Sequence, residues 1–350
     1  NDREVILAAR LAGIAPEGLT RSLFLTSGSD ANEAAIAIAK RYTGGYEIAS
    51  PAVSFHGQSE AARAVTFTGW RQGYGPYSPG NYPMIAPYRY RCSFCKSKPD
   101  CDYSCLNTSF ELLDAQADGQ MAAVITEPLF SAGGVIDLPQ GWLQELKKCC
   151  RNRGMLLILD EAQTGLAKLG SMWASDQEDV IPDICTISKH FGGGVAVSAV
   201  MTTDEIESRV SETEFVVAHS HSNDPITSNA AIASIDIILE QNLVEVSKQI
   251  GEYWRGHLNT LYDRYDLIGD IRGRGLLQGI ELVKDRVTKE PAYVEGHEIG
   301  RRCLENGLIF SLRRGGSVIR FVPPFTTTPV QMDLAAEILD NALKEVTLLG

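Results

Sequence analysis

Long apolar segments and an excess of positive charge are both absent from this 350-residue chain. Its longest apolar runs, at residues 155–159 and 195–201, have the length of strands, whereas a membrane-spanning helix needs about 18 apolar residues or more. Lys and Arg number 32 against 44 Asp and Glu, so the formal net charge is -12, and a field of that sign repels phosphate backbones and anionic lipids. We therefore expect a soluble protein that binds neither nucleic acid nor membranes.

The sequence begins at Asn1 and so has no amino-terminal methionine, and its first residues do not have the pattern of a signal sequence. We interpret the sequence as a processed or truncated product, and we expect a cytoplasmic protein, with a mitochondrial location left open by the missing end. Hydrophobic residues make up 44% and charged residues 22%, a composition typical of a globular protein of one or two domains rather than of a disordered chain.

Pairs of short cysteine hooks, which are typical of zinc ribbons, are not evident among the eight cysteines. Four of them form a C-x2-C-x5-C-x3-C pattern at Cys92, Cys95, Cys101 and Cys105. This spacing favours ordinary loop thiols over zinc ligands, and disulfides would require an oxidising compartment. The cysteines lie in residues 75–106, which are rich in Pro, Gly and Tyr and are predicted to form a long functional or interaction loop.

Strand-like and helix-like segments alternate from the start to about residue 210, which is typical of a mainly parallel sheet covered by helices on both faces. The predicted strands are residues 23–26, 47–50, 122–127, 155–160, 184–188 and 197–201. Helices are predicted at residues 32–41, after a Gly-Ser-Asp cap, and at residues 142–152, before Gly154. The sequence therefore predicts an α/β fold with a large, doubly wound domain.

The pattern changes at Pro225, where two long helical stretches begin. A strand pair around residues 273–275, a helix, another strand and a last helix follow them. We predict a large α/β domain at residues 1–225, and connecting helices with a smaller α+β domain at residues 226–350.

Two polar residues stand where predicted apolar strands end, and in an α/β sheet ligands collect at the carboxyl ends of the strands. Asp160 could pair there with a pyridinium nitrogen and keep it protonated, and a helix cap or a magnesium ligand is the alternative. Lys189 follows the next predicted strand, and three consecutive glycines begin three residues after it, at Gly192. A lysine that loses solvent in a cleft has its pKa lowered toward the neutral amine that attacks aldehydes, whereas a surface lysine stays solvated.

Three further motifs suit other parts of a ligand. Gly28 and Ser29 offer backbone N–H groups at a helix start, which favour a phosphate, and a plain glycine turn is the alternative. Phe55 and His56 place an aromatic ring beside an imidazole. Arg320, in an apolar strand, matches a substrate carboxylate through its guanidinium fork, and a structural salt bridge is the alternative.

Taken together, these motifs resemble the class III pyridoxal-phosphate aminotransferases, which have the fold-type I architecture. The motifs are, in order, Ser27-Gly28-Ser29, residues 32–35, Phe55-His56-Gly57, Glu127-Pro128, residues 160–165 and Ser188-Lys189. Asp160 precedes Lys189 by 29 residues, which also fits the family, and the resemblance covers essentially the whole chain. Within that family the chain is most similar to the 2,2-dialkylglycine decarboxylases, through residues 131–136, 153–165, 268–277 and 283–291.

The resemblance implies pyridoxal 5'-phosphate as the cofactor. Lys189 would carry it as a Schiff base and move the proton, and Asp160 would bind the pyridine nitrogen. The other implied cofactor contacts are Phe55 and Ala162 on the two ring faces, Gln163 on the ring oxygen, His56 behind Asp160, and Gly28 with Ser29 on the phosphate. The substrates would be an amino acid and a keto acid, with Arg320 on the substrate carboxylate.

The family also implies a homodimer with shared active sites. A hydroxyl from the neighbouring subunit binds the phosphate, and the matching residue in this chain is Ser220. The same segment of the family carries an alkali-metal site, which we align with Ser220, Ser222 and Asp224 and assign to potassium or sodium.

The subfamily likeness predicts decarboxylation coupled to transamination of a 2,2-dialkylglycine-type amino acid, with a keto acid such as pyruvate as acceptor. The bond perpendicular to the cofactor ring breaks most easily, so Ser131 and Lys189 would hold the departing carboxylate out of the ring plane. Three departures stand against this reaction: Ala132 replaces a second serine, Phe55 replaces a tryptophan, and the family's amino-terminal arm is missing. The alternatives are an ordinary class III aminotransferase without CO2 loss and a non-catalytic member of the family.

Overall fold

The computed structural model describes residues 1–95 and 100–349, which divide into two compact units. The first unit comprises Asn1–Phe130, Leu138–Leu166 and Ser171–Gln241, and the second comprises Ser131–Asp137, Ala167–Gly170 and the chain from Asn242 onward. Each unit has its own sheet and its own hydrophobic core.

The first unit is built on a sheet in which seven described strands have the order β1-β9-β8-β7-β4-β2-β3. These strands are β1 (Arg21–Leu25), β2 (Glu47–Pro51), β3 (Asn81–Met84), β4 (Met121–Thr126), β7 (Leu156–Asp160), β8 (Ile184–Ile187) and β9 (Ser198–Thr202). β9 pairs antiparallel with β1 and β8, while β8, β7, β4, β2 and β3 run parallel to one another. The prediction of a mainly parallel α/β sheet is confirmed, and the carboxyl ends of the parallel strands lie at one edge.

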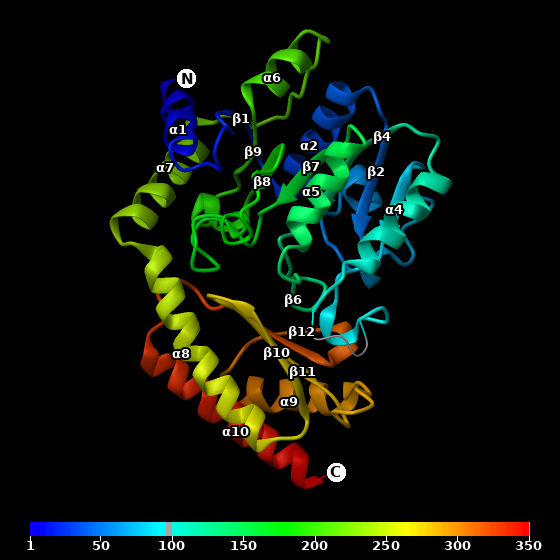
Figure 1. Cartoon of the computed structure of the whole chain (residues 1–350). Coiled ribbons are helices and arrows are strands. Elements are labelled where there is room, and N and C mark those ends of the chain that lie inside the picture. Colours follow the sequence, from blue (N-terminus) through cyan, green and yellow to red (C-terminus); the bar gives the residue numbers. More distant parts are fainter. Residues whose placement is uncertain (96–99, 350) are drawn as a thin grey trace. The chain divides into compact units, whose positions relative to one another are not determined.

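Helices flank this sheet (Figure 1). They are α1 (Asp2–Ala12), α2 (Gly28–Thr43), α3 (Glu60–Ala64), α4 (Ser104–Gln116), α5 (Trp142–Asn152), α6 (Asp204–Ser211) and α7 (Pro225–Glu240), and the short strand β5 (Leu129–Phe130) also belongs to this unit. α2 packs against β4, β7, β8 and β9. It begins where Ser27 and Asp30 form a capping box, and it ends at Gly44, whose φ of 77° closes the last turn.

The second unit contains an antiparallel sheet in which four described strands have the order β10-β11-β13-β12. Its elements are β6 (Ile136–Asp137), α8 (Leu243–Arg264), β10 (Ile268–Arg274), β11 (Leu277–Leu282), α9 (Tyr293–Glu305), β12 (Ser311–Arg313), β13 (Val318–Phe321) and α10 (Pro329–Leu349). α8 packs against β10 and β11, and α10 packs against α8 and α9. The core between them includes Trp254, Leu258, Ile280 and Leu339, so this unit has the predicted α+β character.

Two predictions about the organisation of the chain differ from the structure. The predicted boundary at residue 225 differs by one helix, because α7 packs against α1 and the turn Lys189–Gly192 and therefore groups with the first unit. Residues 75–106 are not a continuous loop, because β3 adds to the sheet beside β2 and α4 begins at Ser104. Pro83 lies within β3, and an edge strand tolerates it because one side of that strand makes no ladder hydrogen bonds.

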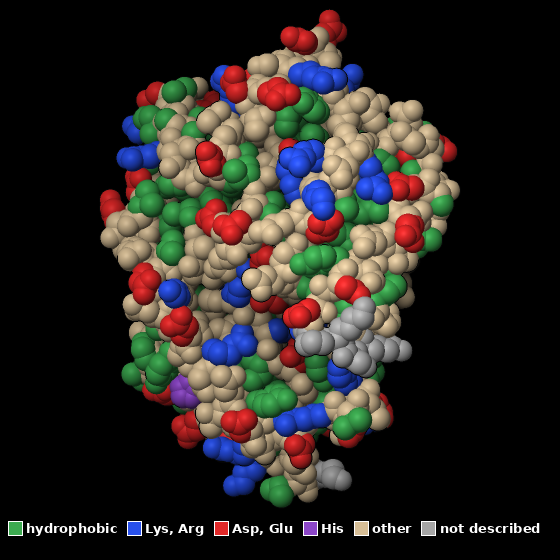
Figure 2. Space-filling view, viewed as in Figure 1, with side chains coloured by type: hydrophobic (Ala, Val, Ile, Leu, Met, Phe, Trp, Pro, Cys, Tyr) green, Lys and Arg blue, Asp and Glu red, His purple; other side chains and the backbone are tan. Residues whose placement is uncertain are grey.

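Acidic and basic side chains are interspersed over the face of the molecule seen in Figure 2. None of the helices in the described ranges combines the length and the hydropathy needed to cross a membrane. All eight cysteines are free thiols, and Cys92, Cys95 and Cys101 are partly exposed. Outside residues 96–99 and 350, His, Cys, Asp and Glu side chains do not form a cluster of three or more that could hold a metal ion.

Candidate active site

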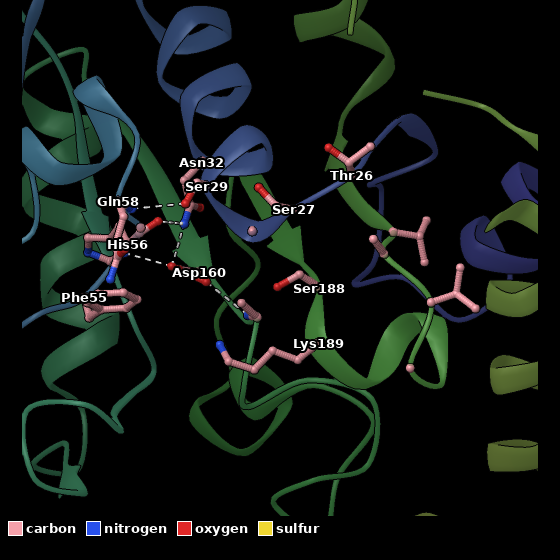
Figure 3. A pocket seen from close by; sticks show the side chains of 17 residues that line it. Thr26, Ser27, Ser29, Asn32, Phe55, His56, Gln58, Asp160, Ser188 and Lys189 are labelled. Atoms are coloured by element: carbon pink, nitrogen blue, oxygen red, sulfur yellow. Dashed lines mark hydrogen bonds and ion pairs between the residues drawn. The ribbon is translucent and has the colours of Figure 1, made fainter. Parts of the chain in front are cut away.

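A cavity of about 510 Å³ lies where the strands of the first unit's sheet end. Its lining includes the first turn of α2, Phe55 and His56 after β2, Asp160 at the end of β7, and Lys189 after β8 (Figure 3). Residues that are far apart in the sequence meet here because the parallel strands end at the same edge of the sheet. The structure therefore brings the predicted lysine, aspartate and aromatic ring into one pocket.

Asp160 is a buried carboxylate that is held in its ionised form. Its side chain is 4% exposed, and Oδ2 accepts hydrogen bonds from Asn32 Nδ2 at 2.7 Å and from His56 Nδ1 at 2.9 Å. Oδ1 accepts the backbone N–H of Ala162 at 3.0 Å. Burial alone would raise the pKa of Asp160, but the hydrogen bond from His56 and the nearby charge of Lys189 outweigh it, so the pKa is lowered.

Asn32 connects Asp160 to the surrounding backbone and side chains. Its amide donates both to Asp160 and to the backbone oxygen of His56, each at 2.7 Å, and its oxygen accepts the hydroxyl of Thr186 at 2.7 Å. The imidazole of His56 is held on its other side by Ser50 Oγ at 3.2 Å. Asn32 and Thr186 have no predicted role. Asn32 is the one polar side chain among the buried residues of α2, and Thr186 is the one hydroxyl residue of the buried strand β8, and this is the signal that identifies them.

Lys189 begins the turn that follows β8, and its backbone adopts an unfavourable conformation. Its φ of 53° lies in the left-handed region, which costs a residue other than glycine about 1–3 kcal/mol when the structure imposes it. The turn is fixed by the buried ring of Phe191 and by the contact of His190 Nε2 with the Gly165 oxygen at 2.8 Å. In Figure 3 the Lys189 side chain extends into the cavity, on the side where Phe55 and Asp160 lie.

The start of α2 lines the opposite part of the cavity with small residues. A Cβ atom at Gly28 would lie 2.7 Å from Ser188 Oγ, and a Cβ atom at Gly57 would lie 2.4 Å from Ser29 Oγ. Ser29 Oγ in turn accepts the backbone N–H of Gln58 at 3.1 Å. The close approach of these segments requires glycine, and it leaves the positive end of the α2 dipole beside the cavity, which favours an anion.

Glu127 is a second buried acid near the cavity. It follows β4, is 6% exposed, and accepts the backbone N–H of Phe55 at 2.9 Å through Oε1. Burial raises the pKa of Glu127 to about 7, although the nearby His56 and Lys189 lower it. Glu127 belongs to one of the sequence motifs, but a glutamate after a strand does not by itself indicate a role. Its contact with Phe55 becomes evident only in the structure.

Of the remaining predicted cofactor and metal residues, one lines the cavity and the others lie outside its lining. Ala162 lines the cavity, whereas Gln163 is half-buried in the following turn and is not part of the lining. Ser220 is exposed in the segment that precedes α7, and Ser222 is half-buried there. Asp224 is the residue that immediately precedes α7, and its Oδ2 lies 2.9 Å from His221 Nδ1.

The two predicted substrate residues contact each other within the second unit. Arg320 Nη1 donates to Ser131 Oγ at 2.8 Å, and Nη2 donates to Ser311 Oγ at 3.3 Å. Ser131 is fully buried, so its hydroxyl fixes one end of the guanidinium group. Ala132, beside it, supplies no further hydroxyl.

Comparison with known protein sequences identifies the family to which this chain is similar. The chain matches the model of the family described as aminotransferase class-III over residues 1–343. An uncharacterized aminotransferase of Schizosaccharomyces pombe (strain 972) is 42% identical over 97% of this chain and 77% of that protein. A leucine/methionine racemase of Thermococcus litoralis is 34% identical over 98% of this chain and 77% of that protein.

A solved structure has the same fold. The omega transaminase from Pseudomonas jessenii, crystallised in complex with PMP, superposes with a TM-score of 0.92 at 26% identity, over 99% of this chain and 80% of that chain. The sequence match and the fold match therefore both point to the same family for the chain that carries Lys189 and Asp160 around one cavity. The chain belongs to the class III aminotransferases, a family with the fold-type I architecture.

Proposed function

We propose that this chain is a pyridoxal-phosphate-dependent aminotransferase, which moves an amino group between an amino acid and a keto acid. The observation that supports it most directly is the placement of Lys189, Asp160 and the start of α2 around one cavity. Family membership supports this cofactor, and the description of the family as aminotransferases supports this reaction.

The groups around the cavity suit pyridoxal phosphate part by part. Asp160 is held ionised, so it matches a protonated pyridine nitrogen. The start of α2 suits the phosphate, and a side chain at Gly28 would collide with Ser188, which also lines the cavity. Phe55 and Ala162 both line the cavity, and we assign them to the two faces of the ring.

When bound, pyridoxal phosphate would supply an electron sink for the bond that breaks at the substrate Cα. Lys189 Nζ takes the proton from that carbon and returns it, since its amine extends into the cavity. Asp160 would hold the proton on the pyridine nitrogen, and the three hydrogen bonds that it accepts fix its orientation. Arg320, oriented by Ser131, holds the substrate carboxylate through its guanidinium fork.

A second copy of the chain completes this proposal. Ser220 is exposed, so its hydroxyl is accessible to the phosphate site of a partner subunit. We retain the family's alkali-metal site at Ser220, Ser222 and Asp224, with potassium or sodium as the ion, and we retain Gln163 as the partner of the ring oxygen. Only Oδ2 of Asp224 contacts His221, so Oδ1 is the carboxylate oxygen that we assign to the ion.

Decarboxylation coupled to transamination is the finer form of the proposal. The segments that resemble the 2,2-dialkylglycine decarboxylases support it, as does the buried hydroxyl of Ser131 beside Arg320. Ala132 weakens it, because a missing hydrogen bond to a charged group removes about 1.5–3 kcal/mol of the preference for breaking the bond to the carboxylate. The plain aminotransferase reaction needs no such group, and the relative from Schizosaccharomyces pombe is named an aminotransferase.

A single assay separates these reactions. The protein is loaded with pyridoxal phosphate and incubated with a panel of amino acids that includes 2-aminoisobutyrate, with pyruvate as acceptor. We expect keto-acid products from simple amino acids, and CO2 from 2-aminoisobutyrate at a rate that an Ala132→Ser variant increases. Transamination without CO2 leaves the plain aminotransferase, and racemisation of the amino acids without any keto-acid product contradicts both forms.

A matching chemical test concerns the lysine. Reduction of the loaded protein with borohydride should fix the cofactor on Lys189, because this residue supplies the amine in the cavity. Mapping the modified peptide by mass spectrometry checks this result. Finding the cofactor on another lysine, such as the buried Lys168, contradicts the proposed function.

A further inference from the structure

Four neighbouring strands of the first unit each bring one residue to the same region. The order β8-β7-β4-β2 places these strands side by side. The residues that end or follow them are Lys189, Asp160, Glu127 and Phe55, respectively. The proposed function gives parts to the lysine, the aspartate and the aromatic ring, whereas Glu127, between the strand ends of Asp160 and Phe55, has no part in it.

Glu127 holds the backbone beneath the aromatic ring. The N–H of Phe55 donates to Glu127 Oε1 at 2.9 Å. Phe55 lies beyond Pro51, the last residue of β2, so this N–H is outside the strand ladder. The next N–H, of His56, likewise donates to a side chain, Thr66 Oγ1, at 2.9 Å. Side-chain acceptors therefore fix the segment that carries the ring.

The contact does not depend on the charge of Glu127. Burial raises the pKa of this carboxyl to about 7, with His56 and Lys189 lowering it and Asp160 raising it. A carboxyl group that is partly protonated at neutral pH still accepts a hydrogen bond through its carbonyl oxygen. An amide of the same shape keeps that acceptor, whereas an apolar side chain removes it and leaves a poorly solvated N–H at Phe55.

We propose that Glu127 is a positioning residue for the cofactor, because it fixes the Phe55 backbone and thereby sets the distance and angle of the aromatic ring against the cofactor ring. This inference rests on the proposed function. Stacking of two rings depends on their offset and separation, so a displaced Phe55 would lose contact without leaving the cavity. Glu127 would act through Phe55 and would not touch the reacting atoms.

The test compares cofactor binding in variants of Glu127. Glu127→Gln keeps the acceptor, whereas Glu127→Leu and Glu127→Ala remove it, and two acceptor-free variants are made so that either one suffices if the other does not fold. Apo-protein is titrated with pyridoxal phosphate, and the visible circular dichroism of the bound cofactor is recorded. We expect E127Q to bind within about threefold of wild type, and E127L or E127A to bind about tenfold more weakly with most of the visible signal lost.

Two controls separate positioning from general damage. Glu47 is a buried acid at the other end of β2, so Glu47→Leu tests the cost of removing such a carboxylate away from the cavity, and it should keep the visible signal. In a Phe55→Ala background, loss of the Glu127 acceptor should add less than about twofold, because Glu127 acts through the ring.

The outcomes that overturn the inference are distinct from those that overturn the proposed function. Wild-type affinity and visible signal in the acceptor-free variants overturn it, and so does an equal loss in E127Q. Full additivity with Phe55→Ala also overturns it. If the wild-type protein itself gives no cofactor signal, the proposed function fails instead.

Discussion

At the scale of single residues, the site depends on a carboxylate that stays charged although it is buried. Asp160 receives three hydrogen bonds, from Asn32, His56 and the Ala162 backbone. These donors all favour the ionised form, and they outweigh the loss of solvent. The charge is therefore maintained by the fold rather than by water, and it remains available to a cationic partner in the cavity.

Replacing Asp160 by asparagine tests this role. We expect Asp160→Asn to bind the cofactor and to lose turnover by roughly a thousandfold, because an amide cannot hold a proton on the pyridine nitrogen and removal of one preorganised electrostatic group costs factors of this size. Steady-state transamination rates of the loaded variant give the measurement. Glu161→Gln is the matched control, because Glu161 is equally buried but accepts its hydrogen bonds from Thr164 and the Ser175 backbone. Near-normal turnover in Asp160→Asn would make the carboxylate merely structural.

The residues that could be predicted from the sequence are those whose chemistry is specific by itself. A lysine and an aspartate at the ends of apolar strands indicate a site wherever the strands lie, and both line the cavity. Asn32 and Glu127 could not be assigned because their roles depend on their neighbours in space. Glu127 accepts the backbone N–H of Phe55, in the segment that follows the adjacent strand β2, and the order of the strands is not readable from their sequences.

At the scale of elements, the same argument explains which strands were identifiable. β7 and β8 are buried at every residue and consist mostly of apolar or β-branched side chains, so their composition predicts them. β3 is a short edge strand that contains Pro83 and an exposed face, and its sequence resembles a loop. α7 has an apolar composition that does not reveal its partner, and its packing against α1 places it with the first unit.

The two glycines that bound α2 provide a test at this scale. Gly28→Ala should weaken cofactor binding by roughly tenfold, because the new Cβ atom would lie 2.7 Å from Ser188 Oγ and displace that hydroxyl into the cavity. Gly44→Ala is the control at the other end of the helix, where no atom lies within 4 Å of the new Cβ but φ is 77°. It should lower the free energy of unfolding by about 1 kcal/mol without changing cofactor affinity. Equal effects of the two substitutions on affinity would contradict a specific role of Gly28.

At the scale of the whole molecule, a buried lysine in the second unit should make stability depend on pH. Lys168 is 7% exposed, donates to the Pro323 oxygen at 2.6 Å and lies over the Phe325 ring. Burial lowers the pKa of Lys168 from 10.5 to about 8. Between pH 8 and 10.5 the unfolded chain therefore binds more protons at this residue than the folded chain, and the free energy of unfolding rises with pH.

The prediction is a difference in pH dependence between two proteins. From the pKa shift, the contribution of Lys168 to the free energy of unfolding should increase by about 3 kcal/mol across that window. Lys168→Met lacks the ionisable group, so its stability should not show this increase, and titrations common to both proteins cancel. Denaturant unfolding at several pH values measures the difference. Parallel curves for wild type and variant would show that the lysine is charged and solvated in the folded state.

A last prediction concerns the dimer and depends on which subunit supplies Ser220. Lys189→Ala and Ser220→Asp should each be inactive, the first through loss of the amine and the second because a carboxylate repels the cofactor phosphate. If Ser220 serves the partner's site, a mixed dimer has one site with an intact lysine and an intact serine, so random pairing should restore about a quarter of the wild-type activity. A mixture of Lys189→Ala with Asp160→Asn is the control. Lys189 and Asp160 of one subunit line the same cavity, so in the mixed dimer each subunit's site carries one defect and neither site is intact. If mixed dimers form and the first mixture stays inactive, Ser220 does not act across the interface.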